Sequence, residues 1–240
     1  MQELIDRAVG ILGGIGPLAT VYFMELVIRH TCAEKDQDHI NMVVLNHATI
    51  PDRTDFILGK STENPLEIMI EDAKKLEAAG AGFIVMPCNT AHYFYDEIRK
   101  NVKVEMVSII EETVRYALET VPGLKKLGIL ATDGTIRSGT YDIECARHGI
   151  SCQTPADDER RVLMRIIYDE IKAGKPGDME ALKSVIGSMR ARGCDAVVLG
   201  CTELSTMCAG GELRDGRVVD SLYALAKKTI LLGGKRFRKD

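Results

Sequence analysis

The chain of 240 residues is long enough to bury a large hydrophobic core, either as one α/β domain or as two smaller ones. Its composition, with 45% hydrophobic and 28% charged residues, excludes a disordered chain, a collagen-like repeat and a coiled coil. A net charge of −4 and only 5% aromatic residues argue against nucleic-acid binding, which needs clustered basic residues or aromatic stacking platforms.

Short apolar strands alternate with amphipathic helices in the first half of the chain. The strands are predicted at residues 9–12, 42–45 and 83–86, and the helices at 18–30 and 65–79. Strands that are apolar on both faces indicate a parallel sheet covered by helices on both sides.

The second half repeats this order after a boundary near residues 121–123. We predict strands at 127–130, 196–199 and 217–219, and helices at 140–148, 162–173, 179–192 and 222–232. The basic tail, residues 233–240, is expected to be loose at the surface.

An internal repeat relates the two halves. Cys88 pairs with Cys201, and Ser108 pairs with Ser221, at the same spacing of 113 residues. The repeat predicts an α/β fold of two pseudo-symmetric parallel-sheet domains with the active site in the cleft between them. We expect residues 1–120, completed by 217–240, to carry Cys88, and residues 121–216 to carry Cys201.

Cys88 and Cys201 each directly follow a predicted buried strand. Because ligands bind beyond the carboxyl ends of parallel strands, the pseudo-symmetry would put the two thiols on opposite sides of one cleft. The N-termini of the helices that follow would hold a carboxylate and favour the thiolate form of each cysteine. A thiolate on one side of a carbon can remove its proton while a thiol on the opposite side delivers a new one. This exchange of faces racemises the carbon. The two cysteines therefore predict a racemase.

Two residues near these cysteines could adjust the acidity of the thiols. Glu203 would raise the pKa of a neighbouring thiol, whereas a protonated His92 would lower it. Both could equally be ordinary residues at a helix start. The other five cysteines are interpreted as structural, and neither a C-x-x-C motif nor a histidine pair predicts a metal site.

The sequence predicts a cytoplasmic protein that does not associate with a membrane. It has no run of about 20 apolar residues, and its first residues lack the positive region of a signal peptide. Seven cysteines without an export signal are expected to be reduced thiols.

Five motifs, taken in chain order, resemble those of a known family. They are residues 13–20 (GGIGPLAT), 50–54 (IPDRT), 86–92 (MPCNTAH), 131–136 (ATDGTI) and 200–204 (GCTEL). The chain resembles the cofactor-independent aspartate/glutamate racemase superfamily and, within it, the aspartate racemase branch. Glutamate racemases have an Asp-Ser pair in place of Gly13-Gly14 and a histidine in place of Glu203, so both positions favour the aspartate branch.

The resemblance implies two similar α/β domains with the site between them, no pyridoxal phosphate, no metal, and a homodimer. It implies interconversion of L- and D-aspartate, with glutamate as an alternative substrate. The implied residues are Cys88 and Cys201 as acid and base, Asn89, Thr90 and Thr202 on the α-carboxylate, Thr132 as a further substrate-binding residue, and Arg53 and Lys172 on the side-chain carboxylate. An arginine fork and a lysine suit a dicarboxylic substrate because arginine pairs with a carboxylate through two hydrogen bonds.

Other functions remain open at this point. Residues 14–19 match a G-x-G-x-x-A nucleotide-binding pattern, although the acid expected at the end of the second strand is missing. A non-catalytic dicarboxylate-binding protein and a redox pair formed by Cys88 and Cys201 are two more alternatives. A racemase of broader or different amino-acid specificity is the alternative within the family.

Overall fold

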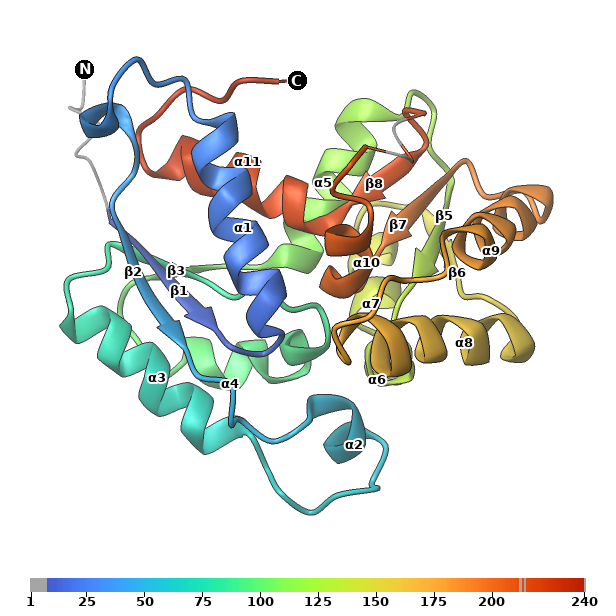
Figure 1. Ribbon diagram of the computed structural model, residues 1–240, viewed down its shortest axis with the longest axis horizontal. Coiled ribbons are helices and arrows are strands. Elements are labelled where there is room, and N and C mark those ends of the chain that lie inside the picture. The colour runs from blue at the N-terminus through green and yellow to red at the C-terminus, as the bar shows by residue number, and fades with distance from the viewer. Residues whose placement is uncertain (1–7, 212, 214, 240) are drawn as a thin grey trace.

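The computed structural model describes residues 8–211, 213 and 215–239 as two four-stranded parallel sheets flanked by helices (Figure 1). The first sheet has the order β2-β1-β3-β4 and the second the order β6-β5-β7-β8. The strands are β1 (Val9–Gly13), β2 (Met42–Asn46), β3 (Phe83–Val85), β4 (Glu105–Val107), β5 (Lys126–Leu130), β6 (Ser151–Gln153), β7 (Ala196–Leu199) and β8 (Val218–Asp220). Because the second sheet repeats the strand order of the first, the predicted fold of two similar parallel-sheet halves is confirmed.

Over the described ranges, five α-helices belong to the first half of the chain and six to the second. The first five are α1 (Pro17–His30), α2 (Arg53–Ile57), α3 (Leu66–Ala78), α4 (Tyr95–Arg99) and α5 (Ile109–Thr120). The others are α6 (Asp133–Ser138), α7 (Thr140–Arg147), α8 (Asp157–Met164), α9 (Met179–Ala191), α10 (Thr202–Met207) and α11 (Ser221–Leu232). None of the described helices is long and apolar enough to cross a membrane.

The helix predicted at 162–173 differs from the observed one in its start and in its winding. Helix α8 begins at Asp157, where the Glu159 carboxylate accepts a hydrogen bond from the Ala156 N–H at 2.7 Å and caps the first turn. Beyond Met164 the chain continues as a π-helix over Arg165–Ile171. Such wider turns are rare and occur often at functional sites. This one ends immediately before Lys172.

One buried hydrophobic cluster spans both sheets. Val9 and Ile11 of β1 belong to the same buried cluster as Leu127 and Ile129 of β5, with α1, α5 and α11 between the sheets. Helix α5, which leaves the first sheet, packs against α7 and β8, and α11, which leaves the second sheet, packs against α1. Helices of each half thus pack against the other half, and this packing fixes the position of the two halves relative to each other.

Two predictions about the C-terminal segment need correction. We predicted that residues 217–240 complete the first domain. Strand β8 instead pairs with β7, so residues 218–220 complete the second sheet. The tail is not loose where it is described. Phe237 forms a bridge with Thr31, and the Arg238 N–H donates to the His30 carbonyl at 2.7 Å. These contacts fasten the tail to the end of α1; Asp240 lies outside the described residues.

Candidate active site

Cys88 and Cys201 lie at the carboxyl ends of β3 and β7, the equivalent central strands of the two sheets. Both are buried, and both line one cavity between the halves. Its other lining residues are Ile15, Asp52, Arg53, Thr54, Asn89, Thr90, Thr132, Tyr168, Lys172, Thr202 and Glu203. The structure therefore brings together every predicted site residue except His92.

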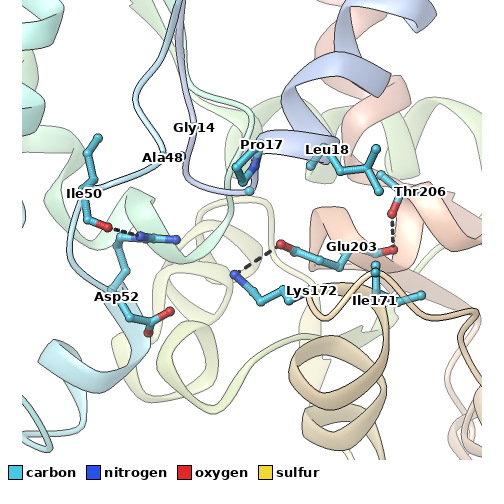
Figure 2. Close-up of a pocket in the computed structure, with 14 residues that line it drawn as sticks. Gly14, Pro17, Leu18, Ala48, Ile50, Asp52, Ile171, Lys172, Glu203 and Thr206 are labelled. Carbon is cyan, nitrogen blue, oxygen red and sulfur yellow. Dashed lines mark hydrogen bonds and ion pairs between the residues drawn. The ribbon is translucent and has the colours of Figure 1, made fainter.

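The space left inside this inner cavity is very small. Its volume is about 10 Å³, which is close to the smallest cavity that can hold one water molecule. A second cavity of about 410 Å³ lies outside it, and Asp52, Arg53, Lys172 and Glu203 line both. Figure 2 shows the outer cavity, where Lys172, directly after the π-helix, and Glu203 of α10 point toward each other. Four charged side chains thus form the boundary between the outer cavity and the two cysteines.

Asn89 is held by residues of the second half. The Tyr141 hydroxyl donates to Asn89 Oδ1 at 2.7 Å, and Asn89 Nδ2 donates to Ser221 Oγ at 3.0 Å. The Ser221 hydroxyl in turn donates to the Leu199 carbonyl at 2.8 Å. All of these groups are buried, so both ends of the Asn89 amide are fixed beside Cys88.

Three threonine hydroxyls form a buried cluster across the cleft. Thr90 Oγ1 lies 2.9 Å from Thr132 Oγ1 and 2.9 Å from Thr135 Oγ1, and the last two are 3.1 Å apart. Thr132 also caps α6 by accepting the Thr135 N–H. A Cβ on Gly134 would meet Thr54 Cα at 2.9 Å, so glycine is needed where α6 approaches α2. The predicted Thr90 and Thr132 therefore contact each other directly.

Arg53 is buried with part of its guanidinium unused. Its Nη1 donates to the carbonyls of Ile50 at 3.1 Å and Pro51 at 2.9 Å. Its Nε is buried with no hydrogen-bond partner among the described residues. A buried donor without a partner is costly, which makes this nitrogen a strong candidate to bind an anion that enters the cleft.

Glu203 joins one cysteine to the predicted lysine. The Cys201 thiol donates to Glu203 Oε2 at 3.0 Å, and Lys172 Nζ forms an ion pair with Glu203 Oε1 at 3.3 Å. Lys172 Nζ also lies 5.0 Å from the centre of the Tyr168 ring. The Tyr168 hydroxyl donates to both Asp52 oxygens at 3.2 Å, which connects the π-helix to the start of α2.

Burial keeps both cysteines protonated in this closed form. It is the largest cause that raises the pKa of Cys88, and the Arg53 charge opposes it. The pKa of Cys201 is raised well above its ordinary value, first by burial and then by the Glu203 carboxylate. The expected thiolates are therefore not favoured here. The 3₁₀ turn Thr90–Phe94 and the six-residue α10 are too short to outweigh the loss of solvent.

His92 does not act on a thiol as a charged group. Burial lowers its pKa to about 4, so the ring is neutral at pH 7. Since the Ile109 N–H must donate to Nε2 at 3.0 Å, Nδ1 carries the hydrogen and donates to the Cys88 carbonyl at 2.8 Å. The hypothesis of an imidazolium that acidifies Cys88 is wrong. His92 instead braces the Cys88 backbone against the start of α5.

The family of the chain follows from comparison with known proteins. Residues 12–229 match the Asp/Glu/Hydantoin racemase family. The chain belongs to this racemase family. It is 33% identical to an aspartate racemase from Picrophilus torridus, with a TM-score of 0.82 over 97% of this chain and 96% of that one.

Two further relatives of this racemase support the same assignment. An aspartate racemase homologue from Pyrococcus horikoshii OT3 is 27% identical, with a TM-score of 0.74 over 96% of this chain and all (100%) of that one. The broad specificity amino-acid racemase RacX of Bacillus subtilis (strain 168) is 28% identical over 92% of this chain and 96% of its own length. The chain is therefore a racemase whose relatives differ in substrate range.

Several residues of the racemase site were not predicted from its sequence. Asp52, Thr54 and Tyr168 line the inner cavity, and Tyr141 and Thr135 hold its predicted residues. One signal was present for Tyr168, which stands four residues before Lys172 and so shares its side of a helix. Among the described residues, no group of three or more His, Cys, Asp or Glu side chains could hold a metal ion.

Proposed function

We propose that this racemase interconverts L- and D-aspartate by proton transfer at Cα between Cys88 and Cys201, with no cofactor. The observation that carries the proposal is that both thiols line one cavity whose wall contains Arg53, a buried cation whose Nε has no hydrogen-bond partner in the described part of the chain. Two cations of this wall, Arg53 and Lys172, suit a dicarboxylic amino acid better than a neutral one.

The proposed reaction moves one proton onto the carbon and one away from it. One cysteine thiolate takes the α-proton while the opposite thiol gives its proton to the other face of the carbanion. Negative charge spreads onto the α-carboxylate, which backbone N–H groups and the hydroxyls of Thr90 and Thr202 would stabilise. Asn89 would help to hold that carboxylate, with Thr132 supporting Thr90. Arg53 and Lys172 would bind the side-chain carboxylate.

Substrate binding must open the closed cavity. A space of about 10 Å³ cannot hold an amino acid, so the walls have to separate. Among the contacts that join the walls are the hydrogen bonds from Tyr168 to Asp52, which connect the two halves. Separation of α2 from the π-helix would connect the outer cavity to both thiols. Contact with water would then lower the pKa of each thiol, because burial is what raises it.

A broader substrate range is the second candidate function. The outer cavity has apolar walls at Leu18, Ile50 and Ile171 as well as its charged residues. Such walls could accept side chains that carry no carboxylate, in keeping with the similarity of the chain to RacX, a broad specificity amino-acid racemase.

The test of this proposal is racemisation of separate L-amino acids by the purified, hydroxylamine-treated protein, followed by chiral chromatography. Hydroxylamine removes any pyridoxal phosphate. Preference for aspartate over glutamate and alanine is the expected result. Equal rates for all three would favour the broad-specificity interpretation, and binding without turnover would favour a dicarboxylate-binding protein.

We also propose a cytoplasmic homodimer. Helix α1 exposes Leu18, Val21 and Ile28 on one side, which is an apolar surface that a second copy could cover. Sedimentation of the protein and of Val21→Glu tests this, since the charged variant should be monomeric. A monomeric parent protein would refute the dimer.

A further inference from the structure

The Glu203 carboxylate uses a different oxygen for Cys201 and for Lys172. Its Oε2 accepts the Cys201 thiol at 3.0 Å and, at a longer distance of 3.4 Å, the Thr202 hydroxyl, whereas its Oε1 pairs with Lys172 Nζ at 3.3 Å. Cys201 is the proposed acid/base residue, and Lys172 is the proposed ligand of the substrate's side-chain carboxylate. One buried carboxylate therefore stands between the group that does the chemistry and the group that recognises the substrate.

The position of this carboxylate is built into the fold. Gly16 faces Glu203 with a φ of +115°, and a Cβ there would lie 2.8 Å from Oε1. Thr206 Oγ1 donates to the Glu203 backbone carbonyl at 2.7 Å and holds the first turn of α10 (Figure 2). The absent side chain at Gly16 leaves the space that the carboxylate occupies, and the strained φ restricts that position to glycine.

The ion pair holds the charge of Lys172 against the Glu203 carboxylate. Lys172 Nζ is in direct contact with Glu203, so its charge stabilises the ionised carboxylate more than it would stabilise a Cys201 thiolate. When the ammonium group moves away, transfer of the Cys201 proton to Glu203 becomes easier. Lys172 can move because its stem is flexible and its side chain is 26% exposed toward the outer cavity.

We propose that Glu203 is a positioning residue that couples recognition of the substrate's side-chain carboxylate to activation of Cys201. This inference rests on the proposed function. When the side-chain carboxylate binds Lys172, the ammonium group leaves Glu203 Oε1. The Cys201 S–H bond then breaks and an O–H bond forms on Glu203, which leaves a thiolate and a neutral carboxylic acid with no change in total charge. The thiolate is then ready to take the α-proton.

The coupling predicts that a dicarboxylic substrate increases kcat as well as affinity. An amino acid without a second carboxylate would leave the Lys172–Glu203 ion pair intact and Cys201 protonated. Other charged or titratable groups also face this cluster. They are Asp52 and Arg53 from the start of α2, Cys88 after β3, Tyr141 of α7 and Tyr168 of the π-helix.

The direct test uses thiolate absorbance at 240 nm in the full-length Cys88→Ser protein, where turnover is blocked and Cys201 is retained. Saturating aspartate, with binding followed by calorimetry, should increase the absorbance by up to one thiolate per chain, and saturating alanine should not. The increase should vanish in Cys88→Ser/Glu203→Gln and in Cys88→Ser/Cys201→Ser. Aspartate binding without an increase, or an increase that persists in the Cys88→Ser/Glu203→Gln variant, would overturn the proposal.

Kinetics of the otherwise unchanged protein give an independent readout. Glu203→Gln should lower kcat for aspartate about 100-fold or more, with a much smaller change in KM, because proton transfer by a positioned group contributes about that much. Glu203→Asp should restore part of kcat. A loss confined to KM would contradict the coupling. If the unmodified protein neither binds nor racemises aspartate, the proposed function itself fails, which is a separate result.

Discussion

Replacing Arg53 should separate recognition of the second carboxylate from proton transfer at Cα. Arg53 is 7% exposed, its Nη1 is used by two backbone carbonyls, and its Nε has no partner among the described residues. The nitrogens not used by the loop are therefore available to a bound carboxylate. Arg53→Ala removes them together with the positive charge.

The expected size of the effect follows from these contacts. Each hydrogen bond to a charged group contributes about 1.5–3 kcal/mol, so the loss of two in a buried site weakens transition-state binding by about 3 kcal/mol or more. Since about 1.4 kcal/mol corresponds to a factor of ten, kcat/KM for aspartate should fall about 100-fold or more. The value for alanine, which has no second carboxylate, should change much less.

The assay is racemisation of L-aspartate and L-alanine by each variant, followed by chiral chromatography. Arg53→Lys keeps the charge and should lose less activity toward aspartate than Arg53→Ala does. Arg137→Ala, at an exposed position on the neighbouring α6, is the matched control and should retain activity. Thermal unfolding checks that the backbone held by Arg53 remains folded. Equal losses for aspartate and alanine would refute the assignment of Arg53 to the side-chain carboxylate.

Three further predictions address the thiols, the contact between the halves and the buried histidine. Cys88→Ser and Cys201→Ser should each abolish racemisation yet permit deuterium exchange into opposite single enantiomers, measured by chiral separation and mass spectrometry. Tyr141→Phe removes a buried 2.7 Å hydrogen bond from Asn89. It should lower the free energy of unfolding by about 1–3 kcal/mol and the Tm by several degrees. Burial lowers the pKa of His92 to about 4, so below pH 6.5 the unfolded chain binds a proton that the folded one does not. This histidine's contribution to stability, about 3 kcal/mol, should be complete above pH 6.5 and lost as the pH falls toward 4, so His92→Gln should flatten that part of the stability curve.

Each of these predictions has a control or a contrary result. Full racemisation by either serine variant would exclude the two-base mechanism. Tyr93→Phe changes a half-exposed tyrosine and should leave Tm unchanged, so an equal shift would remove the special role of Tyr141. A stability curve that keeps the same slope between pH 4 and 6.5 in His92→Gln would show that His92 is not the titrating group.

The parts of the site that follow a repeated local pattern could be predicted from the sequence. Cys88 and Cys201 stand at the ends of apolar strands, and their common spacing indicated two halves that face each other. Residues that reach the cavity from distant segments had no such pattern. Tyr141 of α7 contacts Asn89 from 52 residues further along the chain, and Tyr168 contacts Asp52 across the cleft.

The protonation states could not be predicted because they depend on burial that only the fold determines. The sequence suggested thiolates beside helix N-termini and a charged His92. In the structure both thiols lose their solvent, and His92 is enclosed between the Cys88 carbonyl and the start of α5. The tail was likewise misjudged, because its charge suggested solvent exposure whereas Phe237 packs against His30.

Exchange of the α-proton with solvent tests the central proposal most directly. The purified protein is incubated in D₂O with L-aspartate, L-glutamate or L-alanine, without added cofactor, and the Cα–H signal is followed by NMR. We predict that the aspartate signal disappears fastest and that deuterated D-aspartate forms at the same time. Persistence of the Cα–H signal in all three amino acids, with a correctly folded protein, would contradict proton transfer between Cys88 and Cys201.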